Sequence, residues 1–160
     1  MTGKKLIKKL HSHTAEQTLD LGRQIGQAVS SRFSIALNGD LGTGKTTLVQ
    51  GLAKGLGVDE GYYITSPTFN IMNEYPARNL RLCHLDLYRL GSAEELEYIG
   101  FDDLLGTDAV IVVEWPGLLE EMQFEFDLEI KFSFDQDYNR IISLSPSGQP
   151  GINLVSRLFL

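Results

Sequence analysis

Gly39-Asp40-Leu41-Gly42-Thr43-Gly44-Lys45-Thr46 is the stretch that decides the fold, because it matches the spacing Gly-x-x-x-x-Gly-Lys-[Ser/Thr] at every fixed position. The short apolar segment before it, 33–38, is typical of a buried strand, and the segment 45–57 after it has the spacing of a helix. A strand, a glycine-rich turn and a helix in this order are the context of a phosphate-binding loop. The alternative interpretation is a glycine-rich turn that carries an ordinary surface lysine.

The residue types of this loop suit the binding of phosphate groups. Its glycines let the backbone wrap closely, so that successive N–H groups point at phosphate oxygens, and the helix adds the positive end of its dipole. In such a loop Lys45 would reach the β- and γ-phosphates, and the hydroxyl of Thr46 would hold Mg²⁺. The sequence therefore predicts a site for a nucleoside triphosphate with magnesium.

A second stretch, 108–116, supplies the acid that such a site needs. Its consecutive apolar residues, mostly β-branched, predict a central strand buried on both faces, and that strand ends at Glu114. P-loop hydrolases hold the Mg²⁺ shell with a carboxylate at the end of a strand beside the loop, usually Asp and here Glu114. The alternative is a charge that only terminates the strand. Trp115 could cover the phosphates or cap the core, and the sequence leaves both open.

The segment 80–90 alternates as a strand does, with His84, Asp86 and Tyr88 on one face. We expect Asp86 to orient the attacking water or to hold a water of the Mg²⁺ shell. The alternative is an acid on a solvent-exposed face of the sheet.

The segment 65–69 carries three hydroxyl groups around Pro67, which favours an extended bend. These hydroxyls could report on the γ-phosphate, as switch segments of nucleotide hydrolases do. The alternative is an ordinary polar turn that leads into a strand over 69–75.

The remaining elements follow from capping patterns and periodicity. Thr14 and Gln17 form a capping box that opens a helix to about Arg32. The other predicted elements are a strand at 6–10, helices at 92–98 and 100–105, a hairpin of strands 124–134 and 138–145, a turn-rich segment 145–153, and a strand or helix at 154–160. His11 and His13 suggest a metal site only weakly, because no third ligand stands nearby. We expect one three-layer α/β domain of P-loop type over 1–160, with a mainly parallel sheet and antiparallel additions.

The amino-acid composition and net charge limit the classes of protein to which this chain can belong. The chain has 160 residues, with 42% hydrophobic and 22% charged residues, as expected for a globular domain. No apolar run approaches about 20 residues, so we expect no membrane span. Cys83 is the only cysteine, which excludes an intrachain disulfide and favours a cytoplasmic location. The net charge of −7 opposes non-specific binding to nucleic acid, so a role in a nucleic-acid pathway would require protein partners.

Four segments, in this order and at this chain length, resemble the TsaE (YjeE) family of small bacterial P-loop ATPases of tRNA modification. They are 39–47, 66–69, 84–90 and 113–116, and the resemblance extends from Thr14 to about Pro116. The family usually carries Ala where this chain has Thr43, whose side chain we expect to point away from phosphate.

The resemblance implies a function that composition alone does not indicate. Members of this family help to install threonylcarbamoyl on the adenosine beside the anticodon of tRNA. They bind the TsaB–TsaD complex and hydrolyse ATP to keep that complex turning over, and they contact tRNA only indirectly. The resemblance therefore implies a Mg²⁺-dependent ATPase that is weak alone and stimulated by its partners, and we expect the isolated chain to be a monomer.

The resemblance also assigns residues to roles. Thr46 and Glu114 look like Mg²⁺ ligands, Asp86 looks catalytic or metal-supporting, and Thr14 looks like a contact near the adenine. Together with the loop, the expected catalytic residues are Lys45, Asp86 and Glu114, and the expected metal site is Thr46, Glu114 and Asp86. The expected ATP-binding residues are Thr14, Gly39, Asp40, Leu41, Gly42, Thr43, Gly44, Lys45, Thr46, Thr47 and Trp115.

Two other functions fit the same loop. A small-molecule kinase would need a second substrate pocket and a lid with several arginines, for which a chain this short leaves little room. A nucleotide-sensing module would bind ATP without hydrolysing it. The sequence contains no obvious arginine finger, and Arg81 and Arg89 are the candidates within this chain.

Overall fold

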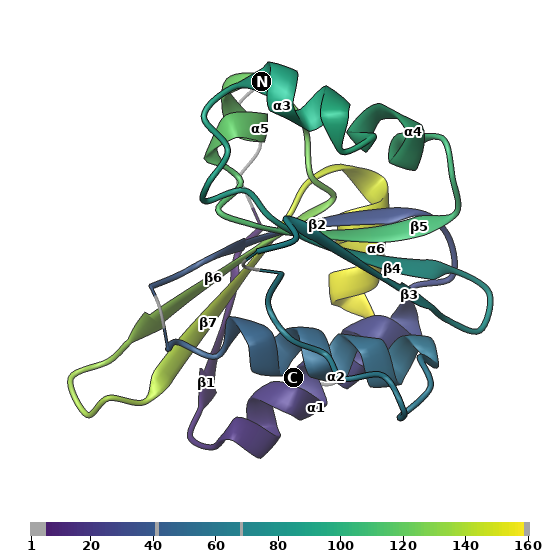
Figure 1. Ribbon diagram of the computed structural model, residues 1–160. Helices are drawn as coiled ribbons and strands as arrows, with labels where there is room; N and C mark the ends of the chain where they lie inside the picture. The colour runs from purple at the N-terminus through teal and green to yellow at the C-terminus, as the bar shows by residue number, and fades with distance from the viewer. Residues whose placement is uncertain (1–5, 41, 68, 159–160) are drawn as a thin grey trace.

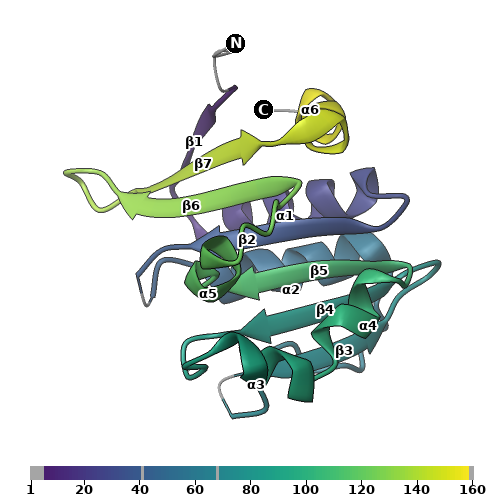
Figure 2. The ribbon, with the colours of Figure 1, turned by 90° about the horizontal axis from the view of Figure 1, so that it is seen from above.

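Seven strands form one sheet in the part of the chain that a computed structural model describes, residues 6–40, 42–67 and 69–158. The strand order is β1-β7-β6-β2-β5-β4-β3 (Figure 2). The four central strands, β6, β2, β5 and β4, are parallel, and the outer pairings are antiparallel. The strands are β1 Lys8–Ser12, β2 Phe33–Asn38, β3 Met72–Pro76, β4 Arg81–Asp86, β5 Ala109–Glu114, β6 Leu128–Phe134 and β7 Arg140–Pro146.

Helices cover both faces of the sheet, which confirms the expected three-layer architecture. In Figure 1, α1 and α2 lie below the sheet and α3, α4 and α5 lie above it. Each layer has its own apolar core, and α6 contributes to the core on the side of α1 and α2. The helices are α1 Ala15–Ala28, α2 Lys45–Leu56, α3 Ala93–Tyr98, α4 Phe101–Leu105, α5 Gly117–Glu121 and α6 Gly148–Ser156.

Two helices of the lower layer pack unusually closely through glycine. A Cβ atom at Gly51 of α2 would lie 2.0 Å from the carbonyl oxygen of Leu19, and one at Gly22 of α1 would lie 2.2 Å from that of Leu48. Only a residue without a side chain lets the two backbones approach so closely. This packing holds α1 against the helix that follows the glycine loop.

The central strands bring the expected site residues to one edge of the sheet. In the parallel register, Leu37 of β2 pairs with Glu114 of β5, and Glu114 pairs with Asp86 of β4. The glycine loop leaves β2 at the same end. The carboxyl ends of parallel strands therefore place both acids beside the loop, as expected for an open α/β sheet.

Several element boundaries differ from the expected ones. Helix α1 ends at Ala28, not near Arg32, because Val29 is already extended. Strand β1 is displaced to Lys8–Ser12, where it pairs with β7. Strand β3 begins only at Met72, since Ile71 adopts a positive φ of 66° and its amide bonds to the carbonyl of Pro67.

The alternating segment at 80–90 is a strand only to Asp86. Beyond it, a turn closes with a hydrogen bond from the Leu90 amide to the Leu87 carbonyl, 3.1 Å long. Ser92 precedes α3 as expected but makes no capping hydrogen bond through its hydroxyl. The carboxylate of Glu95 accepts from the Gly91 amide instead.

The C-terminal third of the structure differs most from the elements that the sequence predicts. The hairpin strands start later than expected, because Phe124 and Phe126 pack against the upper core and Tyr138 adopts a positive φ of 61° in the turn. The segment expected to be turn-rich forms α6, whose close approach to Asp127 requires Gly151. Helix α5 was not expected. None of the helices in the described residues combines the length and apolar composition needed to span a bilayer.

Candidate functional site

The loop between β2 and α2 is shaped by its glycines. Gly39, Gly42 and Gly44 adopt φ values of 156°, 81° and 106°, a region that residues with side chains rarely occupy. Gly44 is the N-cap of α2, and its conformation turns the chain from the loop into the helix. Leu41, which we expected among the nucleotide contacts, lies outside the described residues.

The carbonyl oxygens of this loop accept hydrogen bonds from the protein. The amide and hydroxyl of Thr43 both donate to the Asp40 carbonyl, at 3.3 and 2.7 Å. Nζ of Lys45 donates to the Gly39 carbonyl at 2.7 Å, and Nε of Arg140 donates to the Thr43 carbonyl at 2.9 Å. The hydroxyl of Thr43 is thus directed at its own loop.

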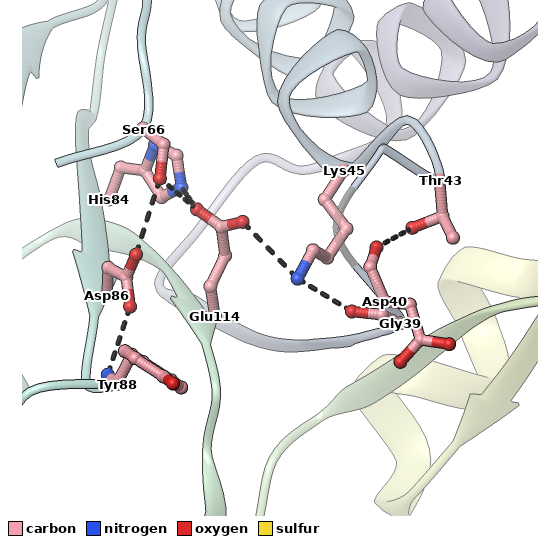
Figure 3. A network of polar contacts seen from close by, with 9 residues as sticks. All are labelled: Gly39, Asp40, Thr43, Lys45, Ser66, His84, Asp86, Tyr88 and Glu114. Carbon is pink, nitrogen blue, oxygen red and sulfur yellow. Dashed lines mark hydrogen bonds and ion pairs between the residues drawn. The ribbon is translucent and has the colours of Figure 1, made fainter. Parts of the chain in front are cut away.

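Glu114 lies at the centre of a buried polar network (Figure 3). Its Oε2 is 2.7 Å from Nε2 of His84 and 2.9 Å from the hydroxyl of Ser66, and its Oε1 is 3.8 Å from Nζ of Lys45. Burial raises the pKa of Glu114, but the hydrogen bond and charge of His84, with Ser66 and Lys45, outweigh burial and hold the pKa below its ordinary value. The network therefore keeps this carboxylate ionised.

Asp86 joins the same network through Ser66. One carboxylate oxygen of Asp86 accepts from the Ser66 hydroxyl at 3.4 Å, and the other accepts from the Tyr88 amide at 3.0 Å. Ser66 thus bridges the two acids (Figure 3). The segment 65–69 therefore places the Ser66 hydroxyl beside the two acids, and its role as a switch segment stays a prediction. Thr68 lies outside the described residues.

These groups line one cavity of about 620 Å³. The residues around it are Gly42, Gly44, Lys45, Thr46, Thr47, Ser66, Asp86, Tyr88, Arg89, Glu114, Trp115 and Arg140. Most of the expected site residues are therefore together. Gly39, Asp40 and Thr43 instead border a smaller cavity of about 350 Å³, and Thr14 is the N-cap of α1, where its hydroxyl accepts from the Gln17 amide at 3.1 Å.

Trp115 stands at the mouth of the site rather than in a core. It is 42% exposed and adopts a left-handed φ of 55°, a strained conformation that is typical of functional sites. Nζ of Lys45 lies 4.6 Å from the centre of its ring, and the ring of Tyr88 lies 5.1 Å away. An aromatic wall therefore faces the lysine of the loop.

Arg89 and Arg81, the two candidates for an arginine finger within this chain, lie in different places. Arg89 lines the cavity, with its guanidinium 4.9 Å from the centre of the Phe69 ring. Arg81 was a wrong candidate: it starts β4, at the end opposite Asp86, and pairs with Glu74 at 3.5 Å.

Sequence reasoning missed His84 and Arg140. The alternating pattern places His84 on the same strand face as Asp86 and gives it no role of its own. In the structure, the His84 ring on β4 contacts the carboxylate of Glu114. Its position two residues before Asp86, on the same face, is the signal that could have found it. Arg140 gave no such signal, because it is 97 residues from the carbonyl that it contacts.

The oxygen donors at this site suit magnesium. In the described residues no group of three or more His, Cys, Asp or Glu side chains is arranged to hold a metal ion. Mg²⁺ keeps several waters and commonly binds one or two carboxylates together with substrate phosphates, so it needs no such group. Glu114, Asp86 and the hydroxyl of Thr46, all at this cavity, are the hard oxygen ligands that Mg²⁺ prefers.

Comparison with known proteins shows which family this chain resembles. The family model described as "Threonylcarbamoyl adenosine biosynthesis protein TsaE" matches residues 12–142. A protein of Haemophilus influenzae, named tRNA threonylcarbamoyladenosine biosynthesis protein TsaE, is 36% identical over 122 residues, which cover 76% of this chain and 75% of that protein. A Treponema pallidum protein of the same name is 36% identical over 134 residues, covering 84% of this chain and 97% of that protein.

A solved structure shares the fold over nearly the whole chain. The crystal structure of Bacillus subtilis YdiB superposes with a TM-score of 0.79 at 29% sequence identity. The superposition covers 97% of this chain and 95% of that one. It therefore includes the C-terminal hairpin and α6, the part of this chain in which the sequence patterns were least informative.

Proposed function

The chain belongs to the TsaE family, and from that premise we propose that it serves tRNA threonylcarbamoyladenosine biosynthesis as a Mg²⁺-dependent ATPase. It binds ATP on the loop of Gly39 to Thr46 and hydrolyses it slowly when alone. It acts in the cytoplasm as a monomer that binds the TsaB–TsaD complex, and it reaches tRNA only through that complex.

One observation carries the proposal more than any other. A buried carboxylate, Glu114, lies 3.8 Å from the lysine of a glycine-rich loop at the start of a helix. A loop of inward amides, a lysine and an acid at the end of the adjacent strand are the parts that P-loop nucleotide hydrolases share. Their joint position at one cavity supports a triphosphate rather than an isolated phosphate ion.

The polar groups at this site have distinct tasks in the proposal. Bound Mg²⁺ would neutralise phosphate charge, and Thr46 and Glu114 would hold it, with Asp86 supporting its water shell. Lys45 places a positive charge where the transferring phosphoryl group becomes more negative. His84 and Ser66 fix the direction of Glu114, and Ser66 and the Tyr88 amide do the same for Asp86, which is placed to orient the attacking water.

Slow hydrolysis by the isolated chain is supported by the position of its arginines. Arg89 is stacked near Phe69, and Arg140 is bonded to a loop carbonyl, so both arginines of the cavity already have contacts within the protein. An arginine that stabilises the transition state typically raises the rate by about 10³-fold or more. We propose that the TsaB–TsaD complex completes the site.

Release of inorganic phosphate from ATP tests the reaction. With Mg²⁺ and no acceptor, the protein should release phosphate, and both Lys45→Ala and Glu114→Ala should reduce this activity by about 100-fold or more, because each removes charge stabilisation. A small-molecule kinase would be nearly inert without an acceptor. A nucleotide-sensing module would bind ATP in calorimetry and show no turnover in any variant.

Reconstitution with purified TsaB and TsaD tests the pathway. We expect the three proteins to co-elute in a manner that depends on ATP, and the rate of phosphate release to rise in the complex. If the complex forms but leaves the rate unchanged, stimulation by the partner is wrong. If no complex forms in any nucleotide state, the assignment of partners is wrong.

A further inference from the structure

Arg140 reaches the phosphate-binding loop from a distant part of the chain. It opens β7, and its Nε donates to the carbonyl of Thr43 at 2.9 Å. Its side chain lies beside Gly44, where a Cβ atom would come within 3.1 Å of Nε and 3.4 Å of Cδ. The missing side chain of Gly44 thus leaves the space that Arg140 occupies.

This hydrogen bond determines the orientation of a peptide group. The carbonyl of Thr43 and the N–H of Gly44 belong to one planar trans peptide, and they point in opposite directions. Holding the carbonyl toward Arg140 therefore also holds the Gly44 N–H in a fixed direction. Inward-pointing amides are what a loop of this kind offers to phosphate.

The first turn of α2 lies next to this contact. In a helix that began one residue earlier, the Thr43 carbonyl would accept from the amide of Thr47, four residues on. Within the described part of α2, the first hydrogen bond of this kind instead joins the Leu48 amide to the Gly44 carbonyl and is 3.0 Å long. Because α2 begins at Lys45 with Gly44 as its N-cap, the Thr47 amide is one of the N-terminal amides without a partner inside the helix, and Thr47 lines the cavity.

Arg140 is itself held in place. Its backbone pairs with Ser12 of β1 on one side and with Phe134 of β6 on the other. The turn before it is closed by Asp135, whose carboxylate accepts from the amides of Asp137 and Asn139 at 2.8 and 2.9 Å. The guanidinium is therefore carried by a three-stranded segment and not by a free loop.

We infer that Arg140 is a positioning residue for nucleotide binding, which orients the Thr43–Gly44 peptide so that the Gly44 amide faces the phosphates beside the Thr47 amide. The inference rests on the proposed function, because it concerns the affinity of that same site for ATP and ADP. It assigns the C-terminal hairpin, which carries none of the loop motifs, a part in building the phosphate site.

Calorimetric titration with Mg·ATP and Mg·ADP tests the inference on the full-length chain. Arg140→Met removes the donor, Arg140→Lys keeps the positive charge but loses the planar guanidinium, and Arg157→Met removes the same charge from an exposed position at the end of α6. We expect both Arg140 variants to bind each nucleotide about ten- to a hundredfold more weakly, as for loss of a charge-assisted hydrogen bond, and Arg157→Met to bind normally.

The possible results separate three cases. If Arg140→Lys binds as the wild type does while Arg140→Met does not, the requirement for the planar guanidinium is wrong, because the lysine ammonium also carries hydrogen-bond donors. If Arg140→Met binds as the wild type does, the contact has no role. If the wild type itself binds neither nucleotide, both the proposed function and this inference are wrong.

A measurement on the wild type covers the case in which the variants fold poorly. Nitrogen-15 NMR should show the Nε–H of Arg140 exchanging with solvent at least about tenfold more slowly than that of exposed Arg157, because it is hydrogen-bonded. Addition of Mg·ADP should shift the amide resonances of Gly44 and Thr47. Equal exchange rates for the two arginines, or unshifted amides in the nucleotide-bound protein, would overturn the inference.

Discussion

His84 and Glu114 are joined by a contact of 2.7 Å between Nε2 and Oε2 in the interior of the protein, where the two residues are 0% and 3% exposed. Nδ1 of His84 has no hydrogen-bond partner in the described residues, so the contact with Glu114 is the ring's one polar interaction there. A buried histidine whose single polar contact is an acid at the cavity serves to position that acid. This relationship couples the stability of the sheet to the geometry of the site.

Replacing His84 should weaken both stability and activity. In His84→Leu, the ionised carboxylate of Glu114 loses a hydrogen bond, and loss of a hydrogen bond to a charged acceptor typically costs about 1.5–3 kcal/mol of unfolding free energy. Phosphate release should also fall, because the carboxylate is no longer held in one direction. His84→Gln, which keeps an N–H donor, is the matched control and should retain more of both. Urea denaturation and the phosphate assay measure the two effects, and equal results for the two variants would refute this role.

Glu114 should contribute to stability in a pH-dependent way. Its pKa is lowered from the ordinary value of 4.5 in the folded protein, so its contribution is fully present above pH 4.5 and is lost as the pH falls through the lowered folded value. The stability difference between the wild type and Glu114→Gln should therefore be constant near neutral pH and shrink in acid. Denaturation curves over a pH series measure this difference, and a gap that widens in acid would contradict the lowered pKa.

Close packing of α1 on α2 predicts an unusual effect of alanine in a helix. Alanine normally favours a helix over glycine by about 1 kcal/mol, but a Cβ at Gly51 would lie 2.0 Å from the Leu19 carbonyl oxygen. The helices would have to separate, so Gly51→Ala should lower the unfolding free energy by at least about 2 kcal/mol. Thermal or urea unfolding measures the change.

Gly117→Ala is the matched control for that variant. Gly117 also lies in a helix, and no atom of the described residues would lie within 4 Å of its Cβ. We expect its stability to be unchanged or raised by less than about 1 kcal/mol. If both alanine variants behave alike, the close approach of the two helices does not govern stability.

The sequence predicted well those parts of the protein that local patterns determine. Strands β2 and β5 are buried on both faces and are mainly apolar in sequence, and the glycine loop has a fixed spacing. Their parallel pairing then brings Glu114 beside Lys45 without further information. The acid and the lysine of the site were therefore accessible from the chain alone.

Parts that depend on contacts distant in sequence were not predictable in this way. The contact of Arg140 with Thr43 requires the predicted hairpin of β6 and β7 to pair with β2 through β6, and no local pattern specifies that second pairing. Helix α6 contains glycine and proline that favour turns locally, and it forms because Leu154 and Val155 pack into the lower core. Tertiary burial outweighed local propensity there.

The contact between Lys45 and Trp115 allows nucleotide binding to be tested by tryptophan fluorescence. Nζ of Lys45 is bonded to the Gly39 carbonyl and lies 4.6 Å from the ring of Trp115, the only tryptophan of the chain. A phosphate makes a stronger, charge-assisted hydrogen bond with an ammonium group than a neutral carbonyl does. Mg·ATP should therefore draw Lys45 from Gly39 and change the environment of the indole ring.

Tryptophan emission should consequently change on addition of Mg·ATP, in a saturable manner, with the same Kd as calorimetry. Lys45→Met, which keeps a side chain of similar length without the charge, should show no such change at the same concentrations, because it loses both the cation beside the ring and the phosphate contact. Unchanged emission in a protein that calorimetry shows to be saturated would mean that Lys45 stays on Gly39, and the proposed contact between Lys45 and the β- and γ-phosphates would then be wrong.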